Sequence, residues 1–164
     1  MKLRTLVIVF GVLSVAFSSC TKEAGPAGAD GNANVKSLVF NAPNLGGVFW
    51  SDTLKGISYP SLENSLLLTY IKDEDCINNW YSVPGIGCLN RYMVQVFTYP
   101  MLDTSNTGLS MQLRDPDGSP YTGTAITFTK VRVIVAPANS NWAGKKEMDY
   151  TDYQATCRYF NISE

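Results

Sequence analysis

Residues 125–136 read AITFTKVRVIVA, and this stretch decides the fold. Its apolar side chains change parity part-way: Ile126 and Phe128 share one parity, whereas the three valines of 131–135 share the other. Because side chains alternate strictly between the two faces of a strand, one flat strand does not place both sets inward. The stretch therefore predicts a β-bulge, or a long strand whose two halves face different layers, and either suits a β-sandwich. The predicted position of the bulge is Thr129 or Lys130.

Other stretches of the chain show the same strand alternation. In residues 109–114 (LSMQLR) every second side chain is apolar and the others are polar, which is typical of a half-buried strand. Residues 115–118 (DPDG) follow with turn chemistry, since proline sets φ and glycine accepts a positive φ. About seven short strands predict an all-β fold, an antiparallel β-sandwich. The remaining predicted strands lie at 35–40, 47–54, 66–71 and 92–97.

The C-terminal segment changes period from two to three or four. Apolar residues recur at this spacing between positions 150 and 160, which predicts one short helix over about 149–162, packed on the sheet. Asp149 or Thr151 is suited to cap its N-terminus. The predicted apolar face consists of Tyr150, Tyr153, Cys157 and Phe160.

The N-terminus has the three-part layout of a secretory signal. Lys2 and Arg4 precede an apolar run of 13 residues at 5–17 (TLVIVFGVLSVAF), and two serines then precede Cys20. The run is shorter than the about 20 residues that a membrane-spanning helix needs. The sequence therefore predicts a signal peptide at 1–19, a segment at 20–33 and a folded domain at 34–164.

The residues at the predicted cleavage site, FSSC at 17–20, resemble the lipobox of bacterial lipoproteins. In that family the cysteine is acylated after the signal is removed, and several acyl chains give stable anchoring. The resemblance implies lipidation of Cys20, and Thr21 in place of Asp implies the outer membrane. Only part of the charged export signal of Bacteroidetes lipoproteins is present in TKE at 21–23, so surface and periplasmic orientation both stay open.

Residues 25–33 (GPAGADGNA) contain three Gly-X-Y triplets, too few for a stable collagen helix, and read as a flexible tether. A lipobox cysteine, a short collagen-like GPAGADG stretch and GNANV at 31–35 together resemble uncharacterised lipoproteins of Bacteroidetes. The resemblance extends loosely to 130–136 and 149–162. The resemblance implies a cellular location and a domain architecture, but it implies no activity.

Composition excludes several function classes. The 164 residues include 13 Lys+Arg, 14 Asp+Glu and no His, giving a net charge of -1. A nucleic-acid binder normally has a basic excess. Without histidine, neither Ser-His-Asp or Cys-His catalysis nor a His-ligated metal centre is possible. We expect no cofactor and no nucleic-acid partner, and a non-enzymatic role is favoured over a carboxylate-dependent hydrolase.

Three cysteines remain once Cys20 is assigned to the lipid. The sequence favours a disulfide between Cys76 and Cys88, which flank an 11-residue loop, with Cys157 as a free, buried thiol. Pairing of Cys157 with either of the others, or no bridge, remains the alternative.

Two acidic motifs are candidates for a cation. Asp73 and Asp75 in DED at 73–75 would converge on an ion, or else belong to a solvated loop, which is the more common case. The motif DPDG at 115–118 resembles the opening of a calcium loop but lacks its closing glutamate, and a turn accounts for it.

Aromatic residues at predicted strand ends and in loops have two interpretations. They fill the core of a small β domain, or they form a surface that stacks on sugar rings. Trp80 and Tyr81, inside the predicted disulfide loop, are the strongest binding candidates. Thr53 lies in an Asp-Thr-Leu motif that resembles an O-glycosylation signal of Bacteroidetes. The other aromatic candidates are Trp50, Tyr59 and Trp142.

The sequence thus predicts a lipid-anchored envelope protein with one β-sandwich domain and a structural or binding role. A surface module that binds glycans is the alternative, and a carboxylate-dependent hydrolase is less favoured. Its predicted partners are the membrane, through the lipid anchor, and a glycan or another envelope protein.

Overall fold

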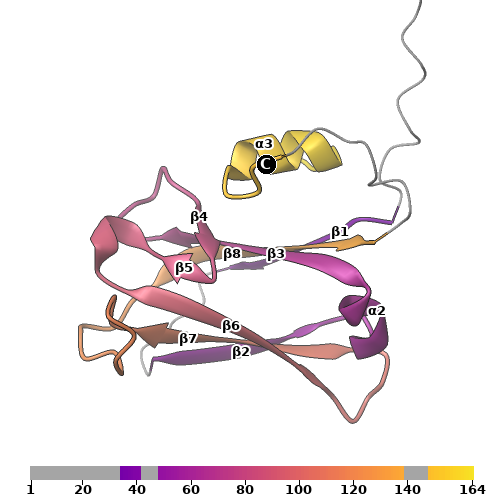
Figure 1. Cartoon of the computed structure of the whole chain (residues 1–164), viewed down its shortest axis with the longest axis horizontal. Helices are drawn as coiled ribbons and strands as arrows, with labels where there is room; N and C mark the ends of the chain where they lie inside the picture. Colours follow the sequence, from indigo (N-terminus) through magenta and orange to yellow (C-terminus); the bar gives the residue numbers. More distant parts are fainter. Residues whose placement is uncertain (1–33, 42–47, 139–147) are drawn as a thin grey trace, which may run out of the picture. The chain divides into compact units, whose positions relative to one another are not determined.

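The computed structural model describes residues 34–41, 48–138 and 148–164. All of them belong to the compact unit Asn32–Glu164. Two four-stranded antiparallel sheets face each other, and one C-terminal helix packs on the outside of the first sheet (Figure 1). This architecture confirms the predicted all-β sandwich. Cys20, the tether and Trp142 lie outside the described residues.

The first sheet has the strand order β1 (Lys36–Asn41), β8 (Phe128–Pro137), β3 (Ser65–Asp73) and β4 (Tyr81–Val83). The second has the order β2 (Phe49–Leu54), β7 (Thr107–Arg114), β6 (Met93–Pro100) and β5 (Gly85–Ile86). The short helix α2 (Tyr59–Glu63) follows β2, and a 3-10 turn, η1 (Cys88–Asn90), follows β5. No helix among the described residues combines the length and apolar character needed to cross a membrane.

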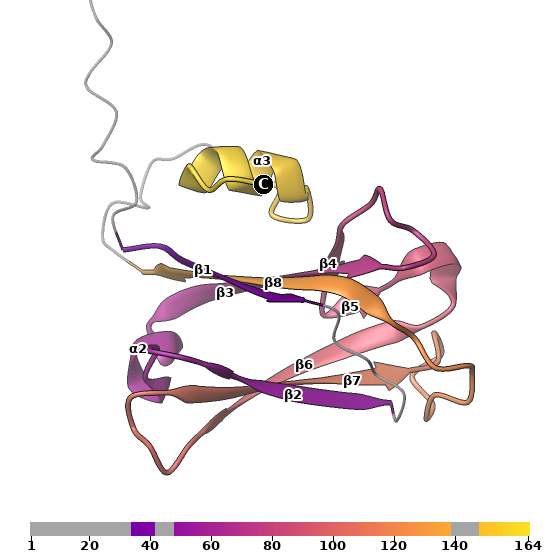
Figure 2. The ribbon, with the colours of Figure 1, turned by 180° about the vertical axis from the view of Figure 1, so that it is seen from behind.

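The main core lies between the sheets (Figure 2). Apolar side chains of β6 and β7 meet those of β3 and β8. Phe40 of β1 and Trp50 of β2, on an edge strand of each sheet, are in edge-to-face contact with ring centroids 5.3 Å apart. The strands β4 and β5 were not predicted, because they are only two to three residues long and lie within the disulfide loop.

The predicted β-bulge is confirmed on β8. Lys72 pairs with Lys130 but the next residue, Asp73, pairs with Phe128, so Thr129 is the extra residue. The bulge resets the parity of the strand. As a result Phe128 and Val131 both point into the core between the sheets, and the residues between the valines face the helix.

Helix α3 (Tyr153–Phe160) is shorter than the predicted 149–162, and its N-cap is Asp152. The predicted caps were wrong: Oδ1 of Asp149 accepts hydrogen bonds from the backbone and hydroxyl of Thr151, and so stabilises the preceding turn. The predicted apolar face is correct at Tyr153, Cys157 and Phe160, which are buried. They pack on Tyr70, Ile134 and Ala136 of the first sheet.

Candidate functional site

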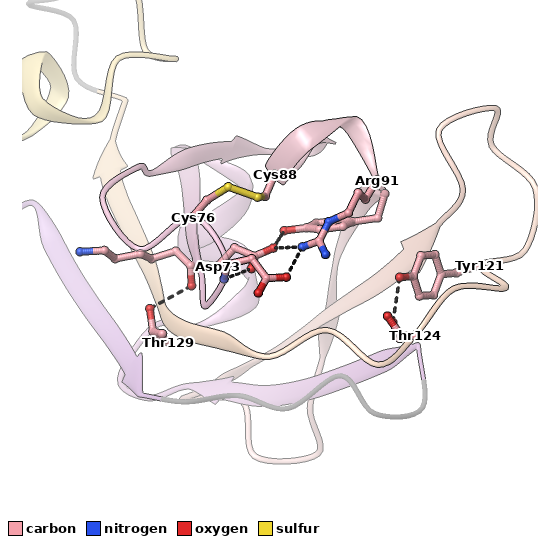
Figure 3. Close-up of polar contacts among 10 residues, drawn as sticks. Asp73, Cys76, Cys88, Arg91, Tyr121, Thr124 and Thr129 are labelled. Atoms are coloured by element: carbon pink, nitrogen blue, oxygen red, sulfur yellow. Dashed lines mark hydrogen bonds and ion pairs between the residues drawn. A yellow bond between two sulfur atoms is a disulfide. The ribbon is translucent and has the colours of Figure 1, made fainter.

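A disulfide between Cys76 and Cys88 closes the loop that carries β4 and β5 (Figure 3). Their Cα atoms are 6.1 Å apart, and Cys88 is fully buried at the start of η1. The pairing is the one that the sequence favoured. It ties the end of β3 to the segment that enters β6, and thereby holds the loop that contains Trp80 and Tyr81.

The acidic cluster at 73–75 binds an arginine of this chain. Nη2 of Arg91 lies 2.7 Å from Oδ2 of Asp75 and 3.5 Å from Oδ2 of Asp73. Oδ1 of Asp73 accepts a hydrogen bond from the backbone N–H of Asp75 at 2.8 Å. Asp73 is 1% exposed, so the interpretation as a solvated loop is wrong for this residue. The carboxylates converge, which was the less favoured interpretation of the sequence, and they do so on a guanidinium.

Tyr92 completes this network from inside the core. Its hydroxyl donates a hydrogen bond to Oδ2 of Asp73, and its ring is fully buried. Burial, and then the hydrogen bond to Asp73, raise the pKa of Tyr92 far above its ordinary value. The hydrogen bond to Asp75 raises the pKa of Arg91. The phenol is therefore neutral and the guanidinium charged at neutral pH, which stabilises the buried carboxylate.

The second acidic motif is a turn. The backbone N–H of Gly118 donates to the carbonyl of Asp115, and φ of Gly118 is 88°. The carboxylate of Asp117 accepts from the backbone of Ser119, and that of Asp115 accepts from Thr122. These carboxylates stabilise the turn itself. The described residues contain no cluster of three or more side chains suited to hold a metal ion.

The aromatic candidates do not share one surface. Trp80 is half-buried and stacks on Tyr153 of α3, with centroids 4.3 Å apart and an interplanar angle of 22°. Nζ of Lys72 lies 5.8 Å from the centroid of the Trp80 ring. Trp50 packs on Phe40 at the edge of the core. Tyr59, at the start of α2, lines a separate hollow of about 400 Å³ with Met101.

Tyr81 and Trp80 line a hollow of about 430 Å³ between the disulfide loop and the N-terminus of α3, which we call the loop hollow. Its polar side chains offer amide, carboxylate and hydroxyl groups, the hydrogen-bonding groups that suit a polyhydroxylated ligand. The structure thus places Trp80 and Tyr81, the two strongest binding candidates of the sequence, in one hollow. One face of the Trp80 ring is covered by Tyr153. The other lining residues are Asn78, Asn79, Thr151, Asp152, Tyr153 and Gln154.

Thr53 lies on the edge strand β2 and is half-buried. Its hydroxyl lies 3.8 Å from Sδ of Met101, and its backbone N–H donates to Oδ1 of Asp52. O-glycosylation of Thr53 stays a prediction.

Behind α3, a buried arginine contacts the free thiol. Nη1 of Arg132 donates to the carbonyl of Ser163 at 2.6 Å and lies 3.8 Å from Sγ of Cys157. The guanidinium also lies 5.6 Å from the ring centroid of Tyr153. Arg132 therefore attaches the C-terminal residues to the first sheet. This contact had a signal in the sequence, a charged residue inside the apolar run at 131–136, but no partner was inferred for it.

Comparisons with protein-family models, curated proteins and solved structures find no match to this chain.

Proposed function

We propose that this protein is a lipid-anchored component of the bacterial cell envelope that presents one β-sandwich domain with a structural or binding role. The observation that carries the proposal is the N-terminal sequence, in which a charged start and a 13-residue apolar run end directly at Cys20. Acylation of this cysteine would attach the chain to the outer membrane.

The fold supports this proposal. The first strand, β1, begins at Lys36, so about 15 residues separate it from the proposed anchor. Fully extended, these residues reach roughly 50 Å. The hydrophobic core of the sandwich is formed by side chains from both of its sheets. Its disulfide suits an oxidising compartment outside the cytoplasm.

The anchor is tested by comparing the wild-type chain with Cys20→Ser in membrane fractions. We expect the wild type in the membrane fraction, with an intact mass that corresponds to acylated Cys20 as the first residue. Cys20→Ser should leave that fraction, whereas Cys157→Ser should remain in it. An unmodified Cys20 in membrane-extracted protein would disprove the proposal.

A second candidate function, binding of surface glycans, has support from the loop hollow. Tyr81 and Trp80 stand there beside Asn79 and Gln154, and such a mixture of aromatic and amide groups suits the apolar and hydroxyl faces of a sugar. Trp80→Ala is an ambiguous test because it also removes the stack on Tyr153.

Tyr81→Ala and Asn79→Ala are the better variants for this second candidate. If the loop hollow binds sugar, both should weaken binding on a glycan array, while Tyr59→Ala in the other hollow should not. A folded wild-type protein that binds no glycan on the array would remove this candidate and leave the anchor proposal intact.

A further inference from the structure

The outer face of the second sheet carries large apolar side chains. Leu109, Met111 and Leu113 of β7 point into the core. The alternate residues of β7 and their cross-strand neighbours on β2 and β6 therefore point outward. An antiparallel sheet with one solvated face is normally polar on that face. Here four of its outward side chains are large, apolar and 41–54% exposed: Phe49, Ile86, Phe97 and Tyr99.

The ring of Tyr99 lies flat on this sheet. Its cross-strand partner is Gly108, and a Cβ atom at Gly108 would stand only 2.2 Å from Cε2 of Tyr99. The glycine is thus required for this close approach, and one face of the ring covers it. Two positions earlier Phe97 pairs with Ser110, which is 4% exposed although it points outward. The two aromatic side chains are about 7 Å apart along β6.

The same face of the sheet carries a cation, Arg114 of β7. Nε of Arg114 donates to Oε1 of Gln95 at 3.2 Å, and Nη2 lies 3.5 Å from Oε1 of Gln112. Both partners are neutral, and no acidic side chain of the described residues forms an ion pair with Arg114. Gln112 pairs with Phe49 on one side and with Gln95 on the other. The guanidinium therefore lies near the cross-strand row Phe49–Gln112–Gln95. The adjacent cross-strand row on this face contains Ser110 and Phe97.

The size and layout of this face do not suit a stable protein dimer. Three strands of up to eight residues span on the order of 14 by 27 Å, so two such faces would bury roughly 800 Å². Stable interfaces bury about 1,200 Å² or more. A protein interface also has an apolar centre and a polar rim. Here the central strand β7 presents Gly108, Ser110 and Gln112, while the aromatic residues lie on the flanking strands.

From these relationships we propose that the outer face of the second sheet binds a polysaccharide chain that carries carboxylate groups. Tyr99 and Phe97 stack on the C–H faces of its sugar rings, and Arg114 forms a charge-assisted hydrogen bond with a carboxylate. Gln95 and Gln112 hold the guanidinium in place. The inference rests on the proposed binding role and names its ligand class, but it does not depend on the lipid anchor.

Calorimetric titration of the full chain, extracted from membranes in detergent, tests the proposal. The ligands are polygalacturonate, alginate and hyaluronate, each compared with its own methyl ester. We expect binding to at least one acidic form, with affinity at least about tenfold lower for its methyl ester. Arg114→Gln should lower the affinity for the acidic polysaccharide by a similar factor. The wild-type affinity should fall as the salt concentration rises, and this fall should be absent in Arg114→Gln.

Variants of the platform separate stacking from folding. Tyr99→Ala should weaken binding at least about tenfold, whereas Tyr99→Phe should retain it because the ring remains. Tyr59→Ala, at α2 and outside this face, is the control that should bind as the wild type does, and Tyr81→Ala tests the loop hollow as the competing site. Each variant is checked for an unfolding transition like that of the wild type. If Tyr99→Ala misfolds, Phe97→Ala takes its place, and the same loss of affinity of at least about tenfold is expected.

Three results would overturn the inference: no binding to any of the three polysaccharides, equal affinity for acid and methyl ester, or loss of binding in Tyr81→Ala with none in Tyr99→Ala. The last result would place the sugar in the loop hollow. Wild-type protein that carries acylated Cys20 but binds no acidic polysaccharide would refute this inference alone.

Discussion

The hydroxyl of Tyr92 donates a 2.5 Å hydrogen bond to Oδ2 of Asp73, and both side chains are buried at the edge of the core. With Arg91, this contact connects the end of β3 to the start of β6 beneath the disulfide (Figure 3). Because a buried carboxylate without partners is costly, the network stabilises the fold and holds the loop above it.

Tyr92→Phe should therefore lower the free energy of unfolding. Removing the hydroxyl leaves one oxygen of Asp73 without this donor, and we expect a loss of about 2 kcal/mol in urea unfolding. Tyr121→Phe is a matched control, since its exposed hydroxyl donates only to the carbonyl of Thr124. Equal stability of the two variants would show that the contact to Asp73 is not stabilising.

Stability should also depend on the ionisation of Tyr92. Its pKa is raised in the folded state, so folding favours the neutral phenol. This stabilisation is complete below the unfolded-state pKa of about 10 and is lost as pH rises above it, by up to about 1.4 kcal/mol per pH unit. The wild type should thus lose most, but not all, of its advantage of about 2 kcal/mol over Tyr92→Phe between about pH 10 and pH 11. A constant difference across this range would contradict the assignment.

Reduction of the disulfide should destabilise the domain by about 3 kcal/mol in the chain-entropy model, because residues 76–88 form a short closed loop. Chemical denaturation with and without a thiol reductant measures this change. A Cys76→Ser, Cys88→Ser double variant should be insensitive to the reductant, while Cys157→Ser should respond as the wild type does. A wild type whose midpoint is unchanged by reductant would argue against a stabilising bridge.

Asp152 and Asp149 provide a matched test of the helix cap. Oδ1 of Asp152 accepts from the backbone N–H of Ala155 in the first turn of α3, whereas Oδ1 of Asp149 accepts from the backbone N–H and the hydroxyl of Thr151. Asp152→Ala should cost about 1 kcal/mol and accelerate hydrogen exchange of the α3 amides. Asp149→Ala should leave that exchange nearly unchanged. The reverse order would restore Asp149 as the cap.

Trp80→Ala should loosen α3 from the first sheet, because the indole stacks on Tyr153. We expect the free energy of unfolding to fall by about 1–3 kcal/mol. Relative to the wild type, hydrogen exchange should accelerate more for the α3 amides than for the β7 amides. Tyr59→Ala is the control, since Tyr59 lies at α2 and away from α3. Uniform acceleration in both elements would mean that α3 does not move independently of the sandwich.

Much of the fold was predictable because it depends on local periodicity. Alternation identified the six longer strands, and the parity change at Ile126–Val135 predicted a bulge at Thr129 or Lys130, of which the structure selects Thr129. The helix boundaries were less accurate, because Asp149, Thr151 and Asp152 are all chemically suited to cap. Only the backbone geometry at Asp152 selects among them.

The candidate sites were less predictable, because each depends on residues distant in the chain. The bulge at Thr129 or Lys130, the turn at 115–118 and the favoured Cys76–Cys88 bridge could be predicted from the residues alone, since they follow from alternation, turn chemistry and loop length. Tertiary structure alone decided that Asp73 meets Arg91 and Tyr92, and that Trp80 stacks on Tyr153. It also laid Tyr99 flat on Gly108. The physical reason is that cross-strand register and sheet order bring these side chains together, and neither is encoded in the spacing of the residues concerned.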